Sequence, residues 1–342
     1  MLKPEGRNRV TTTKPAVTLG IALVFAWIAP GKQAGAEGWR MVETLLGHRG
    51  TLRGEVYQLT LPREDLNVSV KGVPLEPELA LTGWLAFKPL PKGCLLRGRL
   101  VLLEGEAPKT IARLEKRGIQ TVPLSLRLPN ANPPIQYVEI RGQGPRAHLA
   151  QVLRESLLFL GPPPTPPSLT PGPGTETMPP SLTPTPPVGV VVPSGDWSKI
   201  ENLLGRGQPL GDVLVYEVPR TERIQEQGVE IPPAMGMETQ FRFQKVRGMA
   251  LSGNGFMGLF PSATPMRDLV AAMGEFLVDS GELERVSKSL SKNHVLITAT
   301  RPALREGGSR LFFLHFWVLG DPTEIAGGLK TAINLMGGSG QY

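Results

Sequence analysis

Side chains suited to metal or nucleophilic chemistry are scarce in this chain of 342 residues, which holds four His and one Cys, Cys94. A catalytic zinc site usually takes three protein ligands and keeps a fourth position open. One Cys also excludes an intramolecular disulfide. The sequence therefore favours a protein with no catalytic residue, no metal and no cofactor. A metal-dependent, hydrolase-like enzyme with its site in the second half of the chain is the alternative.

Six residues are candidates for ligand binding. They are Arg63, Glu106, Arg220, Glu282, Arg301 and His315. His315 lies in an apolar run, residues 311–319. In an alternating strand it shares one face with Phe313 and Trp317. We interpret it as a buried His that packs in the core and bonds to backbone or to a carboxylate, with a ligand role as the alternative.

Four of the candidates form two pairs of similar residues. Glu106 and Glu282 each begin an expected helix, where the helix dipole favours an acid by about 0.3–1 kcal/mol. A metal or acid–base role is the alternative for them. Arg63 and Arg220 each follow a Pro at the end of an expected strand. Each arginine either binds an anion or forms an ion pair with a neighbouring carboxylate, and we favour the ion pair.

Two copies of one unit position these residues. The landmark pairs are Trp39 with Trp197, Arg63 with Arg220, Gly98 with Gly274, Glu106 with Glu282, and Ile135 with Leu311. The offset is 156–158 residues in the first part of the unit and 176 residues in the later part. We therefore predict a duplicated domain with an insertion in the second copy near residues 244–272.

Hydrophobic periodicity gives the elements of the first copy. Helices are expected at 39–46, 107–117 and 146–159, and strands at 55–61, 66–70, 79–87, 95–103, 119–126 and 135–140. The second half of the unit thus reads β-α-β-β-α, for which the split β-α-β arrangement is the nearest motif. The fold class is α+β. Two homologous repeats each form a mostly antiparallel sheet with helices packed on one face, and a Pro-rich linker joins them.

The ends of these repeats are marked by composition. Of the residues 162–187, 12 are Pro, and the hexapeptide PPSLTP occurs there twice. Such a tract is expected to be an extended spacer, so rigid contact between the repeats is not required. The predicted organisation is repeat 1 at 37–160, the linker at 161–195, and repeat 2 at 196–342.

Residues 1–36 are typical of a secretory signal peptide. Basic residues precede an apolar stretch, 16–29, and the small residues Ala34-Gly35-Ala36 follow it. We expect cleavage after Ala36 and export to the periplasm or the extracellular space. Membrane contact is then expected through the signal peptide before cleavage and not afterwards. An uncleaved N-terminal anchor is the alternative.

Charge gives little support for nucleic acid as a partner. Removal of residues 1–36 lowers the formal net charge from +7 to +3. No stripe of Lys and Arg interleaves with aromatic residues, as single-stranded nucleic acid binding would favour. The partner is therefore expected to be an unidentified envelope or extracellular ligand.

Several segments, taken in order, resemble a known family. They are residues 39–47, 54–57 and 61–66 in the first copy and 274–283 and 311–317 in the second. This chain resembles the LppY/LpqO-type family of exported bacterial proteins of unknown function, named after mycobacterial lipoproteins. The resemblance covers both repeats and implies a location in the cell envelope.

The same resemblance implies a divalent-metal site that this chain lacks in part. Members usually carry a His-Asn-His triplet, and a further His on a later strand. Here Arg301 stands at the first triplet position, residues 125–127 are Ser-Leu-Arg, and the later His is kept as His315 but is Glu139 in repeat 1. A permanent guanidinium charge repels a divalent cation. Arg301 is free instead to pair with Glu282 or to hold an anionic ligand.

These observations favour a non-enzymatic binding or interaction module of the cell envelope with a degenerate family site. Two tethered copies would raise the effective concentration for a bivalent partner. His315, Glu282 and a further ligand gathered in one pocket would favour the enzyme instead.

Overall fold

The structure is a computed structural model. It describes residues 31–124, 128, 130–157, 196–246, 269–304 and 310–337, with the backbone alone for 31–37. The chain divides into two units, residues 1–38 and 39–342, and both repeats lie in the second unit. Most of the predicted signal peptide, the Pro-rich linker and the insertion core at 247–268 lie outside the described residues.

Repeat 1 forms a six-stranded antiparallel sheet in the order β1-β2-β5-β6-β9-β7. Its strands are β1 (Gly50–Arg53), β2 (Val56–Pro62), β5 (Thr82–Pro89), β6 (Cys94–Leu103), β7 (Gln120–Leu124) and β9 (Ile135–Gly144). Its helices are α1 (Gly31–Leu46), the π-helix η1 (Pro77–Leu81), α2 (Ala107–Lys116) and α3 (Arg146–Leu157). Three short strands, β3 (Ser69–Val70), β4 (Val73–Pro74) and β8 (Ala131–Asn132), form a separate small sheet.

Repeat 2 forms a sheet of the same size and topology, in the order β10-β11-β14-β15-β17-β16. Its strands are β10 (Gln208–Leu210), β11 (Val213–Pro219), β14 (Glu238–Val246), β15 (Leu269–Asp279), β16 (Leu296–Pro302) and β17 (Leu311–Gly320). Its helices are α4 (Ser198–Leu204), the 3-10 helix η2 (Pro233–Met235), α5 (Ser280–Lys292) and α6 (Pro322–Ile333). The short strands β12 (Gln225–Glu226) and β13 (Val229–Glu230) form a hairpin.

Strand register confirms the duplication residue by residue. In repeat 1 Gly98 of β6 pairs with Ile140 of β9, and in repeat 2 Gly274 of β15 pairs with Phe316 of β17. Both partners are shifted by the 176 residues that separate the sequence landmarks. In each copy α2 or α5 joins two parallel strands that have an antiparallel strand between them, which is the predicted split β-α-β arrangement.

The paired glycines stand where strands approach closely. A Cβ on Gly274 would lie 2.1 Å from the carbonyl oxygen of Gln240, and a Cβ on Gly98 would lie 2.6 Å from that of Trp84. These distances are shorter than any real contact, so only glycine fits at both positions. The glycine at Gly98 and Gly274 is therefore explained by close backbone packing and does not indicate a binding or catalytic role.

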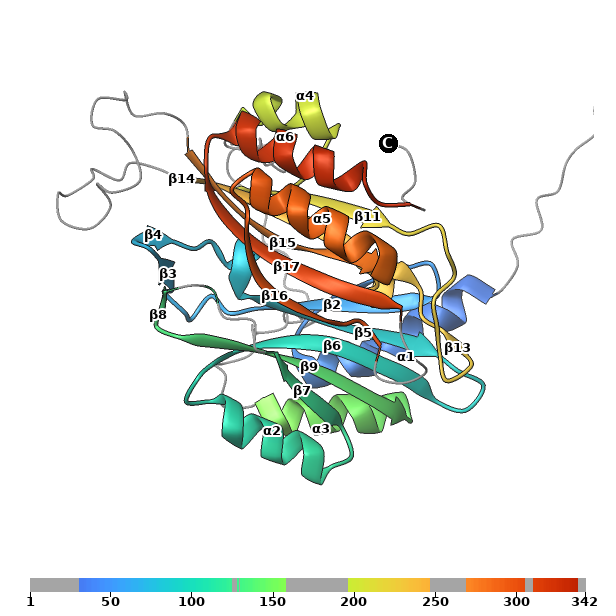
Figure 1. Ribbon diagram of the computed structural model, residues 1–342. Helices are drawn as coiled ribbons and strands as arrows, with labels where there is room; N and C mark the ends of the chain where they lie inside the picture. The colour runs from blue at the N-terminus through green and yellow to red at the C-terminus, as the bar shows by residue number, and fades with distance from the viewer. Residues whose placement is uncertain are drawn as a thin grey trace, which may run out of the picture. The chain divides into compact units, whose positions relative to one another are not determined.

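Each sheet carries its helices on one face, as predicted, and Figure 1 shows α5 and α6 outside one sheet and α2 and α3 outside the other. Apolar residues of each repeat form a core between its own sheet and helices. On β17 the residues Phe312, Leu314 and Phe316 face this core. Phe313 and Trp317 instead belong to clusters shared with repeat 1, so the predicted alternation of this strand is confirmed.

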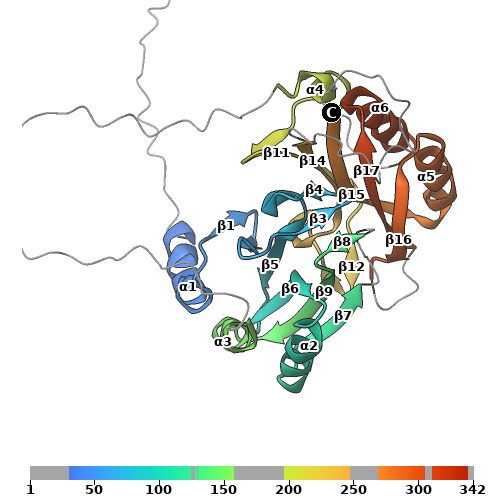
Figure 2. The same cartoon turned by 90° about the vertical axis from the view of Figure 1, so that its left-hand side faces the viewer.

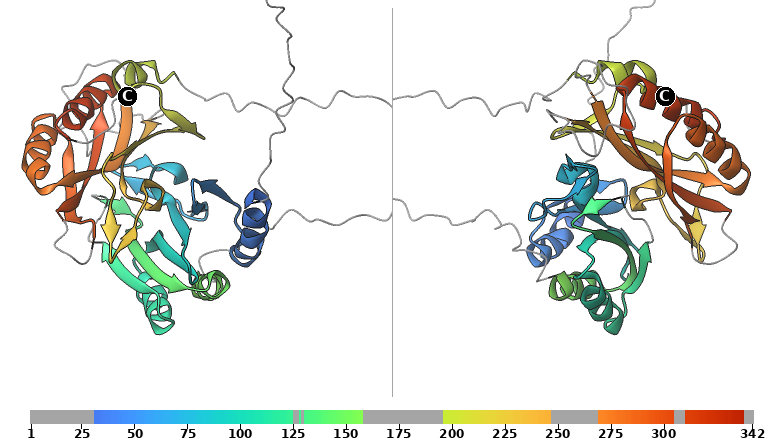
Figure 3. Two further views of the ribbon diagram at one scale, coloured as in Figure 1. Left: turned by 90° about the vertical axis from the view of Figure 1, so that its right-hand side faces the viewer. Right: turned by 60° about the vertical axis from the view of Figure 1, so that its left-hand side comes forward.

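The other faces of the two sheets pack against each other (Figure 2; Figure 3). One apolar cluster joins Val101 and Tyr137 of repeat 1 to Val213 and Trp317 of repeat 2. A second joins residues of β5 to η2 and β17. The linker did not require contact between the repeats, but the structure shows it, and burial of these apolar residues holds the repeats together.

Several local elements differ from the prediction. The strand expected at 66–70 is only Ser69–Val70, in the small separate sheet. The segment 77–81 is a π-helix and not the start of a strand, because Pro77 at its first position lacks the amide hydrogen that a strand ladder needs. The strand β1 was not predicted; Gly54, at φ 62°, turns it back onto β2. Helix α1 begins at Gly31, so the expected cleavage after Ala36 falls within this helix.

Candidate functional site

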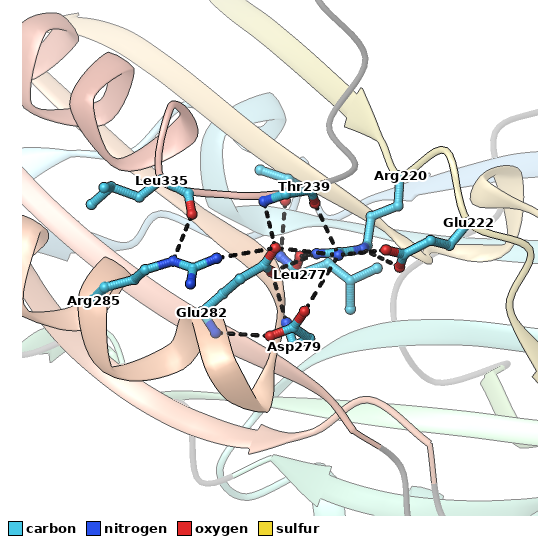
Figure 4. Close-up of polar contacts among 9 residues, drawn as sticks. Arg220, Glu222, Thr239, Leu277, Asp279, Glu282, Arg285 and Leu335 are labelled. Atoms are coloured by element: carbon cyan, nitrogen blue, oxygen red, sulfur yellow. Dashed lines mark hydrogen bonds and ion pairs between the residues drawn. The ribbon is translucent and has the colours of Figure 1, made fainter.

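An arginine at the end of β11 anchors helix α5 in repeat 2 (Figure 4). Arg220 Nη1 donates to Glu282 Oε2 at 2.7 Å and to the carbonyl oxygen of Leu277 at 3.0 Å. Its Nε donates to Glu222 at 3.0 Å. Both side chains of the Arg220–Glu282 pair are 1% exposed. Glu282 also completes a capping box with Asp279, which fixes the first turn of α5.

Repeat 1 holds the equivalent arginine–glutamate pair, without the capping box. Arg63 Nη1 donates to Glu106 Oε2 and to the carbonyl oxygen of Val101, both at 2.9 Å. Its Nε donates to Asp65 at 2.8 Å. The structure thus places four of the sequence candidates in two ion pairs, each within its own repeat. These guanidinium and carboxylate groups are occupied by one another and stabilise the fold.

The remaining two candidates, Arg301 and His315, lie on the face of repeat 2 that packs against repeat 1. His315 Nδ1 lies 3.2 Å from Glu275 Oε2, and Arg301 Nε donates to His315 Nε2 at 3.2 Å. Burial, Arg99 and Arg301 hold the pKa of His315 well below its usual value, so the ring is neutral. Its Nδ1–H then donates to Glu275, and both ring nitrogens are engaged.

Packing is therefore an incomplete account of His315. It is 2% exposed, but it also connects two charged groups of its own sheet, Glu275 on β15 and Arg301 on β16. Glu275 in turn accepts from Arg99 of repeat 1. Arg301 does not reach Glu282, as the sequence had allowed, because α5 lies on the opposite face of the sheet. Arg301 Nη2 instead donates to Glu139 of repeat 1 at 2.5 Å.

Around His315 lies a set of charged side chains that we name the inter-sheet cluster. Its members are Arg97, Arg99, Glu139, Arg141, Glu226, Glu275, Arg301 and His315. Arg99 Nη2 donates to both oxygens of Glu275, at 2.9 and 2.7 Å. Arg99 and Glu275 occupy equivalent positions in the two repeats, 176 residues apart. The same position of the repeat thus carries a positive charge in repeat 1 and a negative charge in repeat 2, and the two residues pair with each other.

The cluster contains more guanidinium groups than carboxylates. Arg97 and Arg141 stand directly opposite each other on β6 and β9 and share Glu226, at 3.6 and 2.5 Å. Burial and the neighbouring Arg141 lower the pKa of Arg97 to about 10. Buried donors without a hydrogen-bond acceptor remain on three arginines of the cluster, namely Arg97 Nη1, Arg99 Nε and Arg141 Nε. The layer between the sheets is therefore electropositive.

Among the residues that the structure describes, no three His, Cys, Asp or Glu side chains gather as a metal site requires. The pocket expected for the enzyme alternative is not formed, since His315 and Glu282 belong to separate networks on opposite faces of one sheet. Across the same residues, no helix combines the length and the apolar character needed to cross a bilayer.

Comparison with known families assigns the chain. Residues 40–158 and 255–335 match the family described as Domain of Unknown Function (DUF1259). Together these segments cover more than half of the sequence. The chain belongs to this family. The DUF1259 match includes Glu106, Glu139, Glu282 and His315, whereas Arg220 lies between the matched segments.

Two further comparisons add little to the DUF1259 assignment. A search of curated proteins found no match. Among solved structures, the chain is similar to the crystal structure of a trimeric bacterial microcompartment shell protein, PduB, with a TM-score of 0.23 and 10% sequence identity. That alignment covers 85% of this chain and 91% of the shell protein.

Sequence reasoning missed most of the inter-sheet cluster in this DUF1259 protein. The signal was present: Arg97 and Arg99 lie two residues apart in the otherwise apolar strand 94–103, and Glu139 and Arg141 repeat the pattern in 135–144. Charges on one face of an alternating strand usually mark the solvent side. Here that face is covered by the other repeat, which periodicity within one strand cannot reveal.

A carboxyl group at the edge of the interface predicts a pH dependence. Glu238 on β14 is 5% exposed and lies 3.6 Å from Arg53 of repeat 1, with Glu217 and Glu275 nearby. Burial and then the Glu217 charge raise the pKa of Glu238 from 4.5 to about 8, against the opposing effect of Arg53. Folding therefore favours the protonated form of Glu238.

The sign follows from that raised pKa. The unfolded chain loses this proton near pH 4.5, so the free energy of unfolding should fall as pH rises from 4.5 to about 8. We expect Glu238→Gln to flatten this decline and to exceed the wild type at pH 8 by about 1–3 kcal/mol. Urea denaturation at several pH values measures the free energy of unfolding of the wild type and of Glu238→Gln. The exposed Glu284→Gln is the control. Parallel curves for all three proteins would contradict the assignment.

Proposed function

We propose that this protein is a non-enzymatic binding protein of the cell envelope, exported to the periplasm or the extracellular space. Its likeness to the LppY/LpqO-type family belongs to this proposal. The observation that carries it is the inter-sheet cluster. The position that would serve a metal, His315, has both ring nitrogens engaged, and the layer around it offers guanidinium donors instead.

The donor chemistry supports binding over catalysis. Glu106 and Glu282 are each held by an arginine of their own repeat, so neither carboxylate is available as an acid, base or metal ligand. Arg301, 3.2 Å from the ring of His315, places a permanent positive charge where a cation would have to bind. A ligand for this layer therefore carries negative charge.

Metal analysis of the untagged mature protein tests the non-enzymatic part of the proposal. We expect zinc, manganese and iron well below one equivalent per chain, in the wild type and in His315→Phe alike. Stoichiometric metal in the wild type that is lost in His315→Phe would overturn the proposal and restore the enzyme. Refolding in the presence of each metal before the assay guards against loss during purification.

Processing at the N-terminus tests the export part. The basic residues, the apolar stretch 16–29 and Ala34-Gly35-Ala36 support a mature chain that starts at Glu37. N-terminal sequencing of protein recovered from the envelope or the medium is expected to begin at Glu37. Replacing Ala36 with a bulky residue such as Leu should leave the precursor uncleaved. Recovery of an intact Met1 in the cytosol would contradict export.

A further inference from the structure

A cavity of about 40 Å³ lies between the two sheets, beside the inter-sheet cluster. Both repeats line it, and its polar lining includes Arg99, Tyr137, Gln240, Arg242, Glu275 and His315, with Thr82 beside them. One water needs about 10–15 Å³, so the cavity has room for about three to four water-sized atoms. This polar space is therefore large enough for a small chemical group and not for a bulky one.

Arg242 brings a cationic group without an ion-pair partner to this cavity. Its Nη1 donates to the carbonyl oxygen of Glu78 at 2.6 Å, and its Nη2 donates to Gln240 Oε1 at 3.2 Å. Among the described residues it has no carboxylate within ion-pair distance. Burial and the neighbouring Arg99 lower the pKa of Arg242, but a guanidinium remains charged in a protein. Its direct hydrogen-bond acceptors are neutral, and the carboxylates of Glu217 and Glu275 act on its charge from a greater distance.

Arg99, from the other repeat, adds a second guanidinium to the lining. Arg99 Nη2 donates to Glu275, while Arg99 Nε is buried without a hydrogen-bond acceptor. Among the described residues that line the cavity, Glu275 is the single carboxylate, and it is already engaged by Arg99 and by the Nδ1–H of His315. Two guanidinium groups thus face the cavity with one carboxylate, which leaves the lining with a net positive charge.

We propose that this cavity binds the carboxylate of a small organic acid between Arg99 of repeat 1 and Arg242 of repeat 2. A carboxylate has three heavy atoms, which matches the volume, and its two oxygens match the paired N–H groups of a guanidinium. Phosphate and sulfate have five heavy atoms and exceed the space. The inference rests on the proposed binding function and names its ligand class.

The rest of the lining fits the organic part of such a ligand. Leu79, Ala80, Trp84 and Met273 supply apolar atoms around the polar groups. The Tyr137 hydroxyl already donates to the carbonyl oxygen of Ala80 at 2.9 Å, which leaves it able to accept but not to donate. Acetate, whose methyl group brings the carboxylate to four heavy atoms, therefore satisfies both the charge and the apolar contacts.

Isothermal titration of the full mature chain with acetate, at constant ionic strength and against chloride, tests the proposal. Wild type is expected to bind one acetate per chain and to gain thermal stability with it. Arg242→Gln removes the unpaired charge and should weaken acetate binding about tenfold or more. Gln240→Glu supplies a carboxylate beside Arg242 and should abolish the acetate response. The exposed Arg40→Gln, an equal change in charge, should leave binding unchanged.

Each outcome decides the ligand class. No acetate binding by the wild type, or equal binding by wild type, Arg242→Gln and Gln240→Glu, would overturn the assignment. Tighter binding of phosphate or sulfate than of acetate would also overturn it, because the size argument would fail. Gln240→Glu keeps Arg242, so it tests the site even if Arg242→Gln does not fold. Failure here leaves the proposed binding function standing, whereas stoichiometric metal would remove that function whatever acetate does.

Discussion

We expect Arg99→Glu to destabilise the protein by about 3–5 kcal/mol or more, because it breaks a buried ion pair and sets two carboxylates against each other. In the wild type, Arg99 Nη2 contacts both oxygens of Glu275, and Glu139 lies 3.9 Å away. The substituted carboxylate would face both. Urea denaturation, followed by far-UV circular dichroism, measures the loss.

The double variant Arg99→Glu, Glu275→Arg is the matched control. It restores opposite charges at the two equivalent positions and should recover at least half of the lost stability. Glu275→Arg alone should resemble Arg99→Glu, since it places a third guanidinium beside Arg99 and Arg301. Additive losses in the double variant would contradict a direct pairing of these two residues across the sheets.

We expect Arg220→Met to cost about 3–5 kcal/mol, because it leaves Glu282 buried without its cationic partner. Glu282 would keep the backbone N–H groups of Asp279 and Gly337 and a distant Arg285, at 3.8 Å. These contacts do not replace two guanidinium hydrogen bonds. The free energy of unfolding of the variant, measured in urea, gives the effect.

Repeat 1 supplies the matched control for that variant. Arg63→Met removes the equivalent group, but Glu106 is 20% exposed whereas Glu282 is 1% exposed. Water can therefore solvate Glu106 in part, and Arg63→Met should cost less than Arg220→Met. An equal or larger loss for Arg63→Met would show that burial does not set the strength of these pairs.

Much of the fold was predictable from the sequence because its information is local. The strands expected at 95–103 and 135–140 and the helix expected at 107–117 lie close to those observed. The constant offset between landmarks gave the duplication. The Arg63–Glu106 ion pair could also be predicted from the sequence. An arginine at a strand end favours an ion pair with a nearby carboxylate, and the helix dipole favours a glutamate at a helix start.

The site was less predictable because it depends on contacts far apart in the chain. Arg301 reaches Glu139 across 162 residues, and Arg99 reaches Glu275 across 176. No local pattern reports that a second sheet covers the charged face of the first. The Pro-rich linker gave no indication that the two repeats pack face to face, and it is this packing that explains the charged residues Arg97 and Arg99.

The central claim is that both repeats form one body around the inter-sheet cluster. Insertion of a protease site in the predicted linker, at residues 161–195, and cleavage of the purified protein test it most directly. Native mass spectrometry should then show a one-to-one complex of the two halves in the wild type and separated halves in Arg99→Glu. Wild-type halves that separate on cleavage would contradict the account.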